Sequence, residues 1–214
     1  RAAWPARAAR EGWVRANLAM SLDGSIVGPA GTSASISTPS DHDLMIRLRN
    51  DADAIIVGAS TARAERYHRS QAQLVVVSRS LQGLAEVPAF VDAPPDRPRP
   101  IVLTCTAADP DRLTALAAVA EVIVAGEDDV DLALALSLLA SRGMRRVHCE
   151  GGAHLVAQLI EQGLLDELHL TITPILAGGT GSTHLVDHLA GGRRDLQCEA
   201  ARSIDGSVFL RCRP

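Results

Sequence analysis

The segment HCEGGAHLVAQLI at residues 148–160 carries the strongest chemical signal in this sequence. An apolar strand is expected to end at Glu150. Gly151 and Gly152 then turn the chain without hindrance from a Cβ, and an amphipathic helix follows. Such a turn leaves free backbone N–H groups and a partial positive charge where a phosphate can bind. Glu150 adds a carboxylate that is costly to bury unless it bonds a ligand or a donor. The turn is therefore half of a nucleotide site, or else only a tight connection.

Two other strand ends carry weaker signals of the same kind. Gly58 ends the run IIVG, and Ser60 or Thr61 either caps the helix that follows or bonds a cofactor. Ser78 and Arg79 follow the run LVVV. A hydroxyl beside a guanidinium suits a phosphomonoester such as the 2′-phosphate of NADPH, and the alternative for Arg79 is a solvated surface arginine.

Two turns complete the candidate chemistry. TPILAGGTGST at 173–183 is dense enough in glycine for its backbone to approach a ligand, or simply forms a flexible loop. In SLDG at 21–24, Asp23 is expected to cap a turn in which Gly24 has a positive φ. The Rossmann fingerprint G-x-G-x-x-G does not occur in the sequence, which disfavours a Rossmann dehydrogenase.

Composition limits the class of protein. The 214 residues are 47% hydrophobic and 2% aromatic, with a net charge of -4 and both signs of charge mixed along the chain. This balance disfavours nucleic-acid binding. Four widely spaced cysteines form no C-x-x-C pair, so no metal site is predicted and buried free thiols are expected. With no apolar run of about 20 residues and no secretory signal, we expect a cytoplasmic enzyme without membrane contact.

The elements that must position these residues are predicted from short apolar runs between amphipathic stretches. A first dozen residues, 1–12, form an arm without assigned role, and 13–214 form one domain. Helices are expected at 39–51, from Asp109-Pro110, at 131–141 and at 153–162, with Thr38 as a cap, and the proline-rich 88–100 as a surface loop. Strands are expected at 14–20, 54–58, 74–78, 100–104, 121–126, 146–152, 167–174, 195–202 and 206–212. Alternation of strand and helix predicts an α/β fold, with a mixed, mostly parallel sheet of eight or nine strands flanked by helices and antiparallel strands at its C-terminal end.

Four segments together resemble the reductase domain of the bacterial riboflavin-biosynthesis deaminase-reductase family: NLAMSLDGSI, LRNDADAIIVGASTARAE, VHCEGG and LDELHLTITPILAGG. They occur in the family's order, and the resemblance covers nearly the whole chain from Val14 to Arg211. The resemblance implies a dihydrofolate reductase-like fold. It also implies NADPH-dependent reduction of the ribose of 5-amino-6-(5-phosphoribosylamino)uracil, and a homodimer.

The resemblance further implies roles for individual residues. Glu150 would be the polar group nearest the hydride transfer, and Arg49 would meet the substrate phosphate. The full substrate-binding set would be Asn17, Ser37, Arg49, Glu65 and Glu150. The cofactor groove would be lined by Gly58, Ser60, Thr61, Ser78, Arg79, Gly151, Gly152 and Gly178.

The sequence departs from the family in three ways, of which the last two concern the substrate. No H-x-E precedes a P-C-x-x-C in the sequence, as it would in the zinc deaminase, so only the reductase step is expected. The family's usual Lys is Asn17, and its Asp-Asp/Asn-Pro-x-Leu segment reads Glu65-Arg66-Tyr67-His68. Two alternatives therefore remain: a paralogue that reduces dihydrofolate or another pterin with NADPH, and a catalytically silent nucleotide-binding protein.

Overall fold

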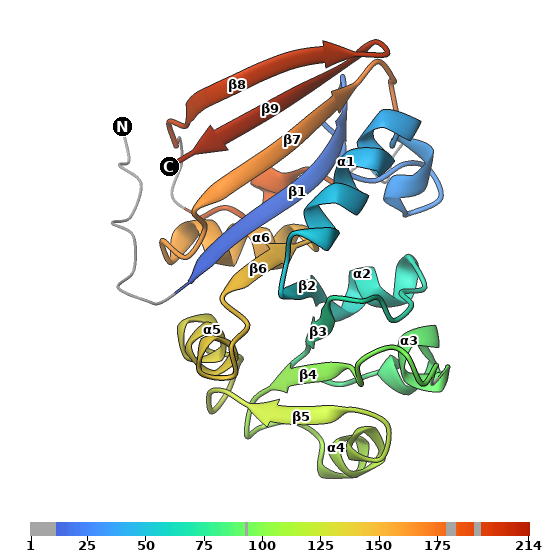
Figure 1. Ribbon diagram of the computed structural model, residues 1–214, viewed down its shortest axis with the longest axis vertical. Coiled ribbons are helices and arrows are strands. Elements are labelled where there is room, and N and C mark those ends of the chain that lie inside the picture. Colours follow the sequence, from blue (N-terminus) through green and yellow to red (C-terminus); the bar gives the residue numbers. More distant parts are fainter. Residues whose placement is uncertain (1–11, 93, 179–182, 191–193) are drawn as a thin grey trace.

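The computed structural model describes residues 12–92, 94–178, 183–190 and 194–214 (Figure 1). The arm expected at 1–12 lies, except for Gly12, outside these residues. The described chain forms a nine-stranded sheet of order β5-β4-β3-β2-β6-β1-β7-β9-β8. The strands are β1 (Trp13–Ser21), β2 (Ala54–Gly58), β3 (Gln73–Val77), β4 (Ile101–Thr104), β5 (Glu121–Val124), β6 (Arg146–Cys149), β7 (Glu167–Thr173), β8 (Gln197–Ile204) and β9 (Ser207–Arg213).

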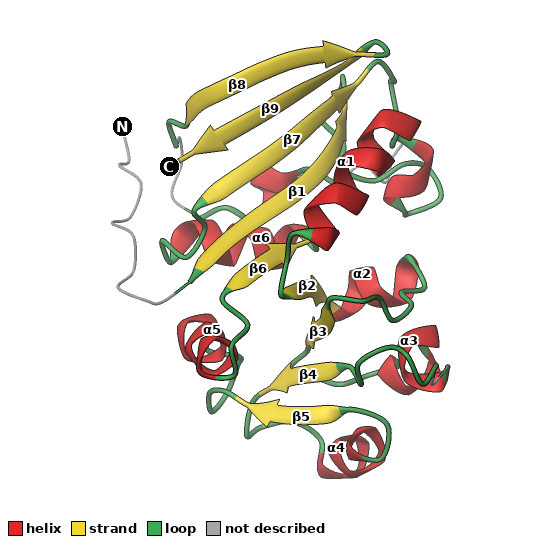
Figure 2. Ribbon diagram, in the orientation of Figure 1, coloured by secondary structure: helices red, strands yellow, loops and turns green. Residues whose placement is uncertain are grey.

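Neighbouring strands from β5 through β7 pair in parallel, and β9 pairs antiparallel with both β7 and β8. Helices cover both faces of the sheet (Figure 2). They are α1 (Pro39–Asn50), α2 (Ala59–Ala64), α3 (Pro88–Val91), α4 (Pro110–Ala117), α5 (Leu132–Ser141) and α6 (Ala153–Glu161), with 3-10 turns at Ser33–Ser35, Leu84–Glu86 and Leu185–His188. The predicted fold class, a mostly parallel sheet with antiparallel C-terminal strands, is confirmed.

Helix starts follow local capping chemistry in three cases. The side chains of Thr38, Asp109 and Asp131 accept hydrogen bonds from backbone N–H groups of the first turns of α1, α4 and α5. For α2 the expected cap is wrong, because the helix begins after Gly58 without a side-chain cap, and Ser60 lies inside it.

Three other expectations need correction. The segment 88–100 is not all loop, because Pro88–Val91 form a short helix whose Phe90 is buried. The strand expected at 146–152 ends at Cys149, where Gly151 turns the chain with a φ of 100°. The cysteines are not all buried, since Cys198 on the edge strand β8 is exposed.

Apolar side chains fill both faces of one half of the sheet. One core packs β1 to β6 against α5 and α6, and a second packs the other face of β2, β3 and β4 against α2, α3 and α4. A partition of this kind follows from the alternation of side chains along each strand.

The sheet face that α2, α3 and α4 cover is polar where it continues beneath α1. Alternation and register place Arg15, Asn17, His148, His169 and Thr171 together on the face of β6, β1 and β7 that α1 covers. The helix itself buries only Asp41 and Leu48. Because neither surface is apolar, α1 covers this part of the sheet without forming a hydrophobic core.

Within the described segments, no helix has the length and apolar content needed to cross a membrane.

Candidate active site

Glu150 lies at the centre of a buried hydrogen-bond cluster just beyond β6. Its side chain is 3% exposed, and Arg49 at the end of α1 donates from Nε to Oε1 (2.5 Å) and from Nη2 to Oε2 (2.6 Å). The hydroxyl of Tyr67, which follows α2, donates to the same Oε2 (2.7 Å). The expectation that this carboxylate requires a donor is met by protein groups. Two residues assigned separate roles from the sequence, Arg49 and Glu150, therefore form one bidentate ion pair.

The cluster shifts the pKa values of Tyr67 and Arg49. Burial and then the charge of Glu150 raise the pKa of Tyr67 well above its usual value, so its hydroxyl keeps its proton. Burial lowers the pKa of Arg49, but the hydrogen bonds and charge of Glu150 outweigh this and raise it. Arg49 is therefore a permanent cation, and its guanidinium carbon lies 5.7 Å from the centre of the Tyr67 ring.

His148 lies below Glu150 on the same face and is fully buried. Its Nε2 is 3.6 Å from Oε1 of Glu150, too far for a hydrogen bond, and burial lowers its pKa to about 4 despite that carboxylate. The imidazole is therefore neutral near pH 7.

Several buried polar atoms around this cluster have no hydrogen-bond partner within the described residues. Buried polar groups are normally paired, and a group of unpaired ones marks a place for water or ligand. Those on or facing the sheet face beneath α1 are Oδ1 of Asn17, Oδ1 of Asp41, both ring nitrogens of His148 and Oγ1 of Thr171. We call the region between α1 and this sheet face the polar chamber.

Two further substrate candidates, Ser37 and Glu65, form hydrogen bonds with neighbouring residues. Oγ of Ser37 donates to Asp41 (2.6 Å) just before α1. Glu65, at the end of α2, accepts a hydrogen bond from the backbone N–H of Ser33 (2.6 Å). The first bond ties the segment before α1 to the helix itself, and the second ties it to the end of α2.

The expected cofactor glycines meet at the carboxyl ends of β2 and β6. The N–H of Gly58 donates to the carbonyl of Gly151 (3.2 Å), and a Cβ on Gly152 would lie 3.3 Å from Oγ1 of Thr61. Gly152 has a φ of 78° and precedes α6, whose first turn has no side-chain cap. Unlike α1, α4 and α5, this nine-residue helix leaves its first N–H groups to another acceptor, which fits a cofactor phosphate.

The other cofactor candidates also lie at the carboxyl ends of the strands. Ser60 is exposed on α2, and Arg79 is exposed just past β3. Ser78 is buried, and its Oγ accepts a hydrogen bond from the N–H of Leu81 (2.9 Å), so this hydroxyl shapes the turn that presents Arg79.

Asp23 holds the loop that follows β7. Its carboxylate accepts hydrogen bonds from the Ser21 hydroxyl (2.5 Å) and from the N–H groups of Ala177 (3.0 Å) and Gly178 (2.8 Å). These bonds lower its pKa. Gly24 has the expected positive φ, and Asp23 caps this distant loop. Residues 179–182 of the glycine-rich segment lie outside the described residues.

A second pocket, of about 380 Å³, opens beside Arg49. Arg69 and Arg97 also line it, and Nη1 of Arg97 is buried without a hydrogen-bond partner in the described chain. Asp53, the carboxylate in the lining, already binds Arg146. Three guanidiniums around one pocket favour an anion.

Sequence reasoning missed Tyr67, His148, Arg69 and Arg97. Tyr67 falls in the segment that departs from the family motif, and a departure does not reveal a new contact. Arg97 comes from the proline-rich segment, which has no periodicity to place it. Among the described residues, no group of three or more His, Cys, Asp or Glu is arranged to hold a metal ion.

A mixed sheet of this order, mostly parallel with antiparallel C-terminal strands, is the dihydrofolate reductase-like fold. Dihydrofolate reductase from Enterococcus faecalis superposes with a TM-score of 0.53 over 95% of this chain and 97% of that one, at 13% identity, and so supports the fold alone. A nicotinamide nucleotide is the cofactor that this class implies.

The chain belongs to the RibD C-terminal domain family, which matches residues 12–210. It is 34% identical over 186 residues to a 2,5-diamino-6-ribosylamino-4(3H)-pyrimidinone 5′-phosphate reductase from Methanothermobacter thermautotrophicus, covering 82% of this chain and 83% of the relative. A solved pyrimidine reductase-like protein from Corynebacterium diphtheriae is 30% identical, with a TM-score of 0.83 over 94% of this chain and 91% of that one.

Proposed function

We propose that residues 13–214 form one NADPH-dependent reductase that converts the ribosyl group of a ribosylaminopyrimidine 5′-phosphate to a ribityl group, in the cytoplasm and as a step of riboflavin biosynthesis. The polar chamber carries this proposal. A polar helix over a polar sheet face, with unpaired atoms of Asn17, Asp41 and His148 between them, is a costly arrangement unless a polar ligand fills it.

The pocket lined by three arginines would receive the 5′-phosphate. Two of the donors of Arg49 are occupied by Glu150, which leaves Nη1, and Nε of Arg69 donates to the carbonyl of Ala89 (2.7 Å). The remaining guanidinium nitrogens, with the unpaired Nη1 of Arg97, supply charge-assisted donors that suit a phosphomonoester. Arg49 thereby joins the phosphate pocket to the buried carboxylate.

The cofactor side would use the uncapped start of α6 for a diphosphate, with Gly58, Thr61, Gly151 and Gly152 against it. Arg79 would select the 2′-phosphate of NADPH by bidentate bonding. The bound nicotinamide would supply the hydride. On the same edge of the sheet, Asp23 would hold Gly178 and its loop in place for the cofactor.

Glu150 would act by electrostatics. Arg49 and Tyr67 hold its carboxylate in one orientation. A fixed carboxylate stabilises the positive charge of a protonated carbon–nitrogen double bond at the sugar carbon, the form that accepts hydride most readily. Asn17, Ser37 and Glu65 would orient the sugar and pyrimidine.

The archaeal relative's name and the bacterial family suggest two substrates that differ at one ring position. The first carries an amino group at C2 and the second an oxo group. Purified protein with NADPH should oxidise the cofactor with one or both. Turnover with dihydrofolate alone would overturn the substrate class, and tight NADPH binding without turnover on any of the three would identify a silent protein.

Cofactor preference tests the assignment of Arg79. Arg79→Ala should weaken NADPH binding by about 1.5–3 kcal/mol, the scale of a charge-assisted hydrogen bond, and leave NADH nearly unchanged. Arg142→Ala, which removes an exposed arginine at the end of α5, is the matched control. Equal losses for both cofactors would remove Arg79 from the site.

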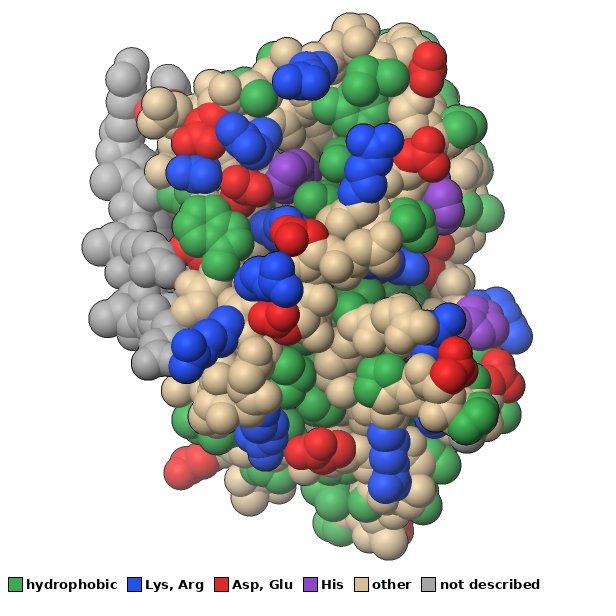
Figure 3. Space-filling view, in the orientation of Figure 1, with side chains coloured by type: hydrophobic (Ala, Val, Ile, Leu, Met, Phe, Trp, Pro, Cys, Tyr) green, Lys and Arg blue, Asp and Glu red, His purple; other side chains and the backbone are tan. Residues whose placement is uncertain are grey.

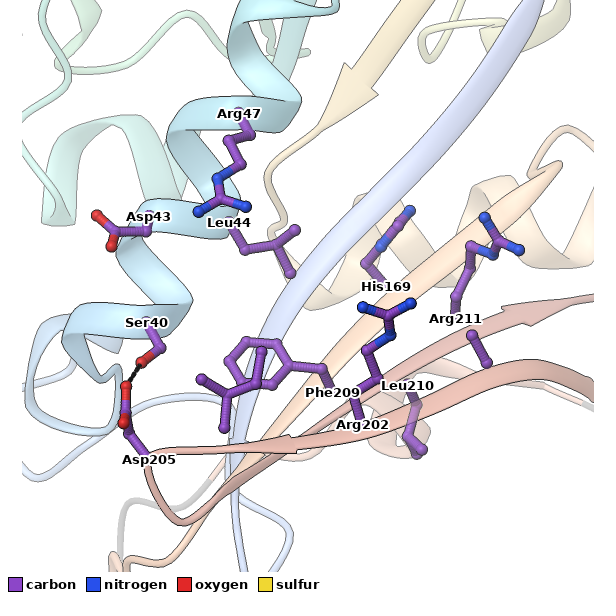
Figure 4. A pocket seen from close by; sticks show the side chains of 12 residues that line it. Ser40, Asp43, Leu44, Arg47, His169, Arg202, Asp205, Phe209, Leu210 and Arg211 are labelled. Carbon is purple, nitrogen blue, oxygen red and sulfur yellow. Dashed lines mark hydrogen bonds between the residues drawn. The ribbon is translucent and has the colours of Figure 1, made fainter.

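The outer strands suggest a homodimer as part of the same proposal. The face of β7, β9 and β8 beside α1 forms a pocket of about 310 Å³ with Leu44, Ile204 and Phe209 in its lining (Figure 4). Basic and acidic side chains mix over this face of the molecule (Figure 3). In the pocket lining, Arg47 and Arg202 lie with Asp43 and Asp205 (Figure 4). A surface with both signs beside apolar groups can pair with itself across a two-fold axis.

Sedimentation equilibrium tests this surface. Phe209→Asp should convert a dimer to a monomer, whereas Leu134→Asp, at an exposed apolar residue on α5, should not. A wild-type protein that sediments as a monomer at micromolar concentration rejects the dimer and leaves the reductase assignment untouched.

A further inference from the structure

Two of the four cysteines face each other across the last hairpin. In the antiparallel register of β8 and β9, Cys198 lies directly opposite Cys212. Cys198 is exposed on the edge strand, and Cys212 is buried one strand further in. Burial and then the adjacent Cys198 thiol raise the pKa of Cys212, which reflects the contact between the two side chains.

The hairpin turn determines how closely the two strands approach here. Asp205 and Gly206 have φ values of 49° and 80°, the two-residue turn type that matches the twist of a hairpin. Residue pairs alternate outward from this turn between hydrogen-bonded and non-hydrogen-bonded positions, which gives Cys212 a non-hydrogen-bonded one. Opposite Cα atoms at such positions are about 4.5 Å apart.

This spacing suits a disulfide bond, which needs Cα atoms about 4.4–6.8 Å apart. A β-bulge between Cys198 and Ala200 frees the strand locally, and the Cys198 thiol donates to the carbonyl of Ala200 (3.3 Å). Rotation of one side chain away from that carbonyl brings its sulfur toward Cys212.

We propose that Cys198 and Cys212 form a reversible dithiol–disulfide site that reacts with small-molecule disulfides. The Cys198 thiolate attacks a reagent disulfide, which forms a mixed disulfide and releases one reagent thiol. The Cys212 thiolate then attacks the Cys198 sulfur, which closes the protein disulfide and releases the second reagent thiol. The two protein thiols lose two electrons and two protons, and the reagent disulfide gains both.

The remaining cysteines do not compete. Cys105 and Cys149 are buried in separate elements, and in the described strand register neither lies opposite a second cysteine that could close a bond. Oxidation is therefore confined to the hairpin, where the bond fastens the edge strand β8 to β9. This inference is independent of the reductase assignment.

Oxidised glutathione tests the site on the native chain. The wild-type protein should lose the mass of two hydrogens, reversibly with dithiothreitol. A tryptic digest without reduction should link peptide 195–202 to peptide 212–214. Cys212→Ser should instead accumulate a glutathione adduct at Cys198 at least tenfold above wild type, and Cys105→Ser should behave as wild type.

Three results overturn the proposal: a stable glutathione adduct on the wild-type chain, a disulfide-linked dimer through Cys198, or no reaction while the protein stays folded. One measurement needs no variant. Because a cross-link restricts the unfolded chain, the oxidised wild-type protein should melt about 5 °C or more above the reduced protein. An unchanged melting temperature with the bond present would show that the hairpin is not held by it, and would also count against the proposal.

Discussion

Replacement of His148 by Phe should remove a defined part of the pH dependence of folding. The imidazole is fully buried, lacks a partner for either nitrogen among the described residues, and has a pKa of about 4 against an ordinary 6.5. In the unfolded chain it takes up a proton near pH 6.5, and in the fold it stays neutral until about pH 4. Between these values the unfolded state binds more protons, so the fold loses stability as pH falls.

The size of the effect follows from the gap between the two pKa values. At 1.36 kcal/mol for each pH unit, the wild-type protein should lose about 3 kcal/mol from this group between pH 6.5 and pH 4. Above pH 6.5 the contribution is constant. Carboxylates titrate in the same range, but they are common to the wild type and the variant and cancel in the difference.

Urea unfolding at intervals from pH 7.5 to 4 measures this difference. The free energy of unfolding of His148→Phe minus that of the wild type should be flat above pH 6.5 and then rise as pH falls. Ile55→Val, at the residue opposite His148 on β2, is the control, since it costs about 0.5–1.5 kcal/mol at every pH without removing a titrating group. A difference curve for His148→Phe that stays flat down to pH 4 would falsify the neutral buried imidazole.

Three further substitutions test other contacts. Arg49→Met leaves the Glu150 carboxylate buried with one donor and should lower the free energy of unfolding in urea by about 3–5 kcal/mol. The double variant with Glu150→Leu should recover most of this loss, and equal losses in the single and double variants would contradict the ion pair. Gly152→Ala forces a side chain onto a φ of 78°, so it should cost about 1–3 kcal/mol of stability, measured by calorimetry, and weaken NADPH binding, measured by titration. The control Gly143→Ala, at a φ of 86° in open space, should affect stability only. Asp23→Asn removes an acceptor from the loop after β7 and should raise KM for NADPH about 3–10-fold with little change in kcat, and the reverse pattern would rule out this role.

Local signals in the sequence predicted most of the fold. Apolar runs of four to eight residues between turn residues are sufficient to place buried parallel strands, and all nine strands were expected within a few residues of their positions. Thr38 was recognised as a cap because capping depends on its immediate neighbours. The short helix Pro88–Val91 was missed because four residues show no helical period, and proline at its start also marks turns.

The candidate site was less accessible to prediction because its contacts depend on long-range register. Arg49 and Glu150 were each expected at a ligand, yet they are 101 positions apart and pair with each other. Only the order of β2, β6 and β1 brings the end of α1 over the end of β6. Likewise, the exposure of Cys198 depends on β8 being the edge strand, which the residue's own surroundings in the sequence do not reveal.

The division of the sheet face into apolar and polar halves has a consequence for how this fold changes over evolutionary time. Side chains beneath α2, α3 and α4 interlock in a core, so substitutions there are selected against through stability before any effect on the cofactor is felt. The helix α1 buries two residues over a polar floor, so replacements on its inner side, other than at Arg49 with its ion pair, disturb little packing. New substrates can therefore be acquired by changing α1 and its floor, while the opposite half keeps the protein folded.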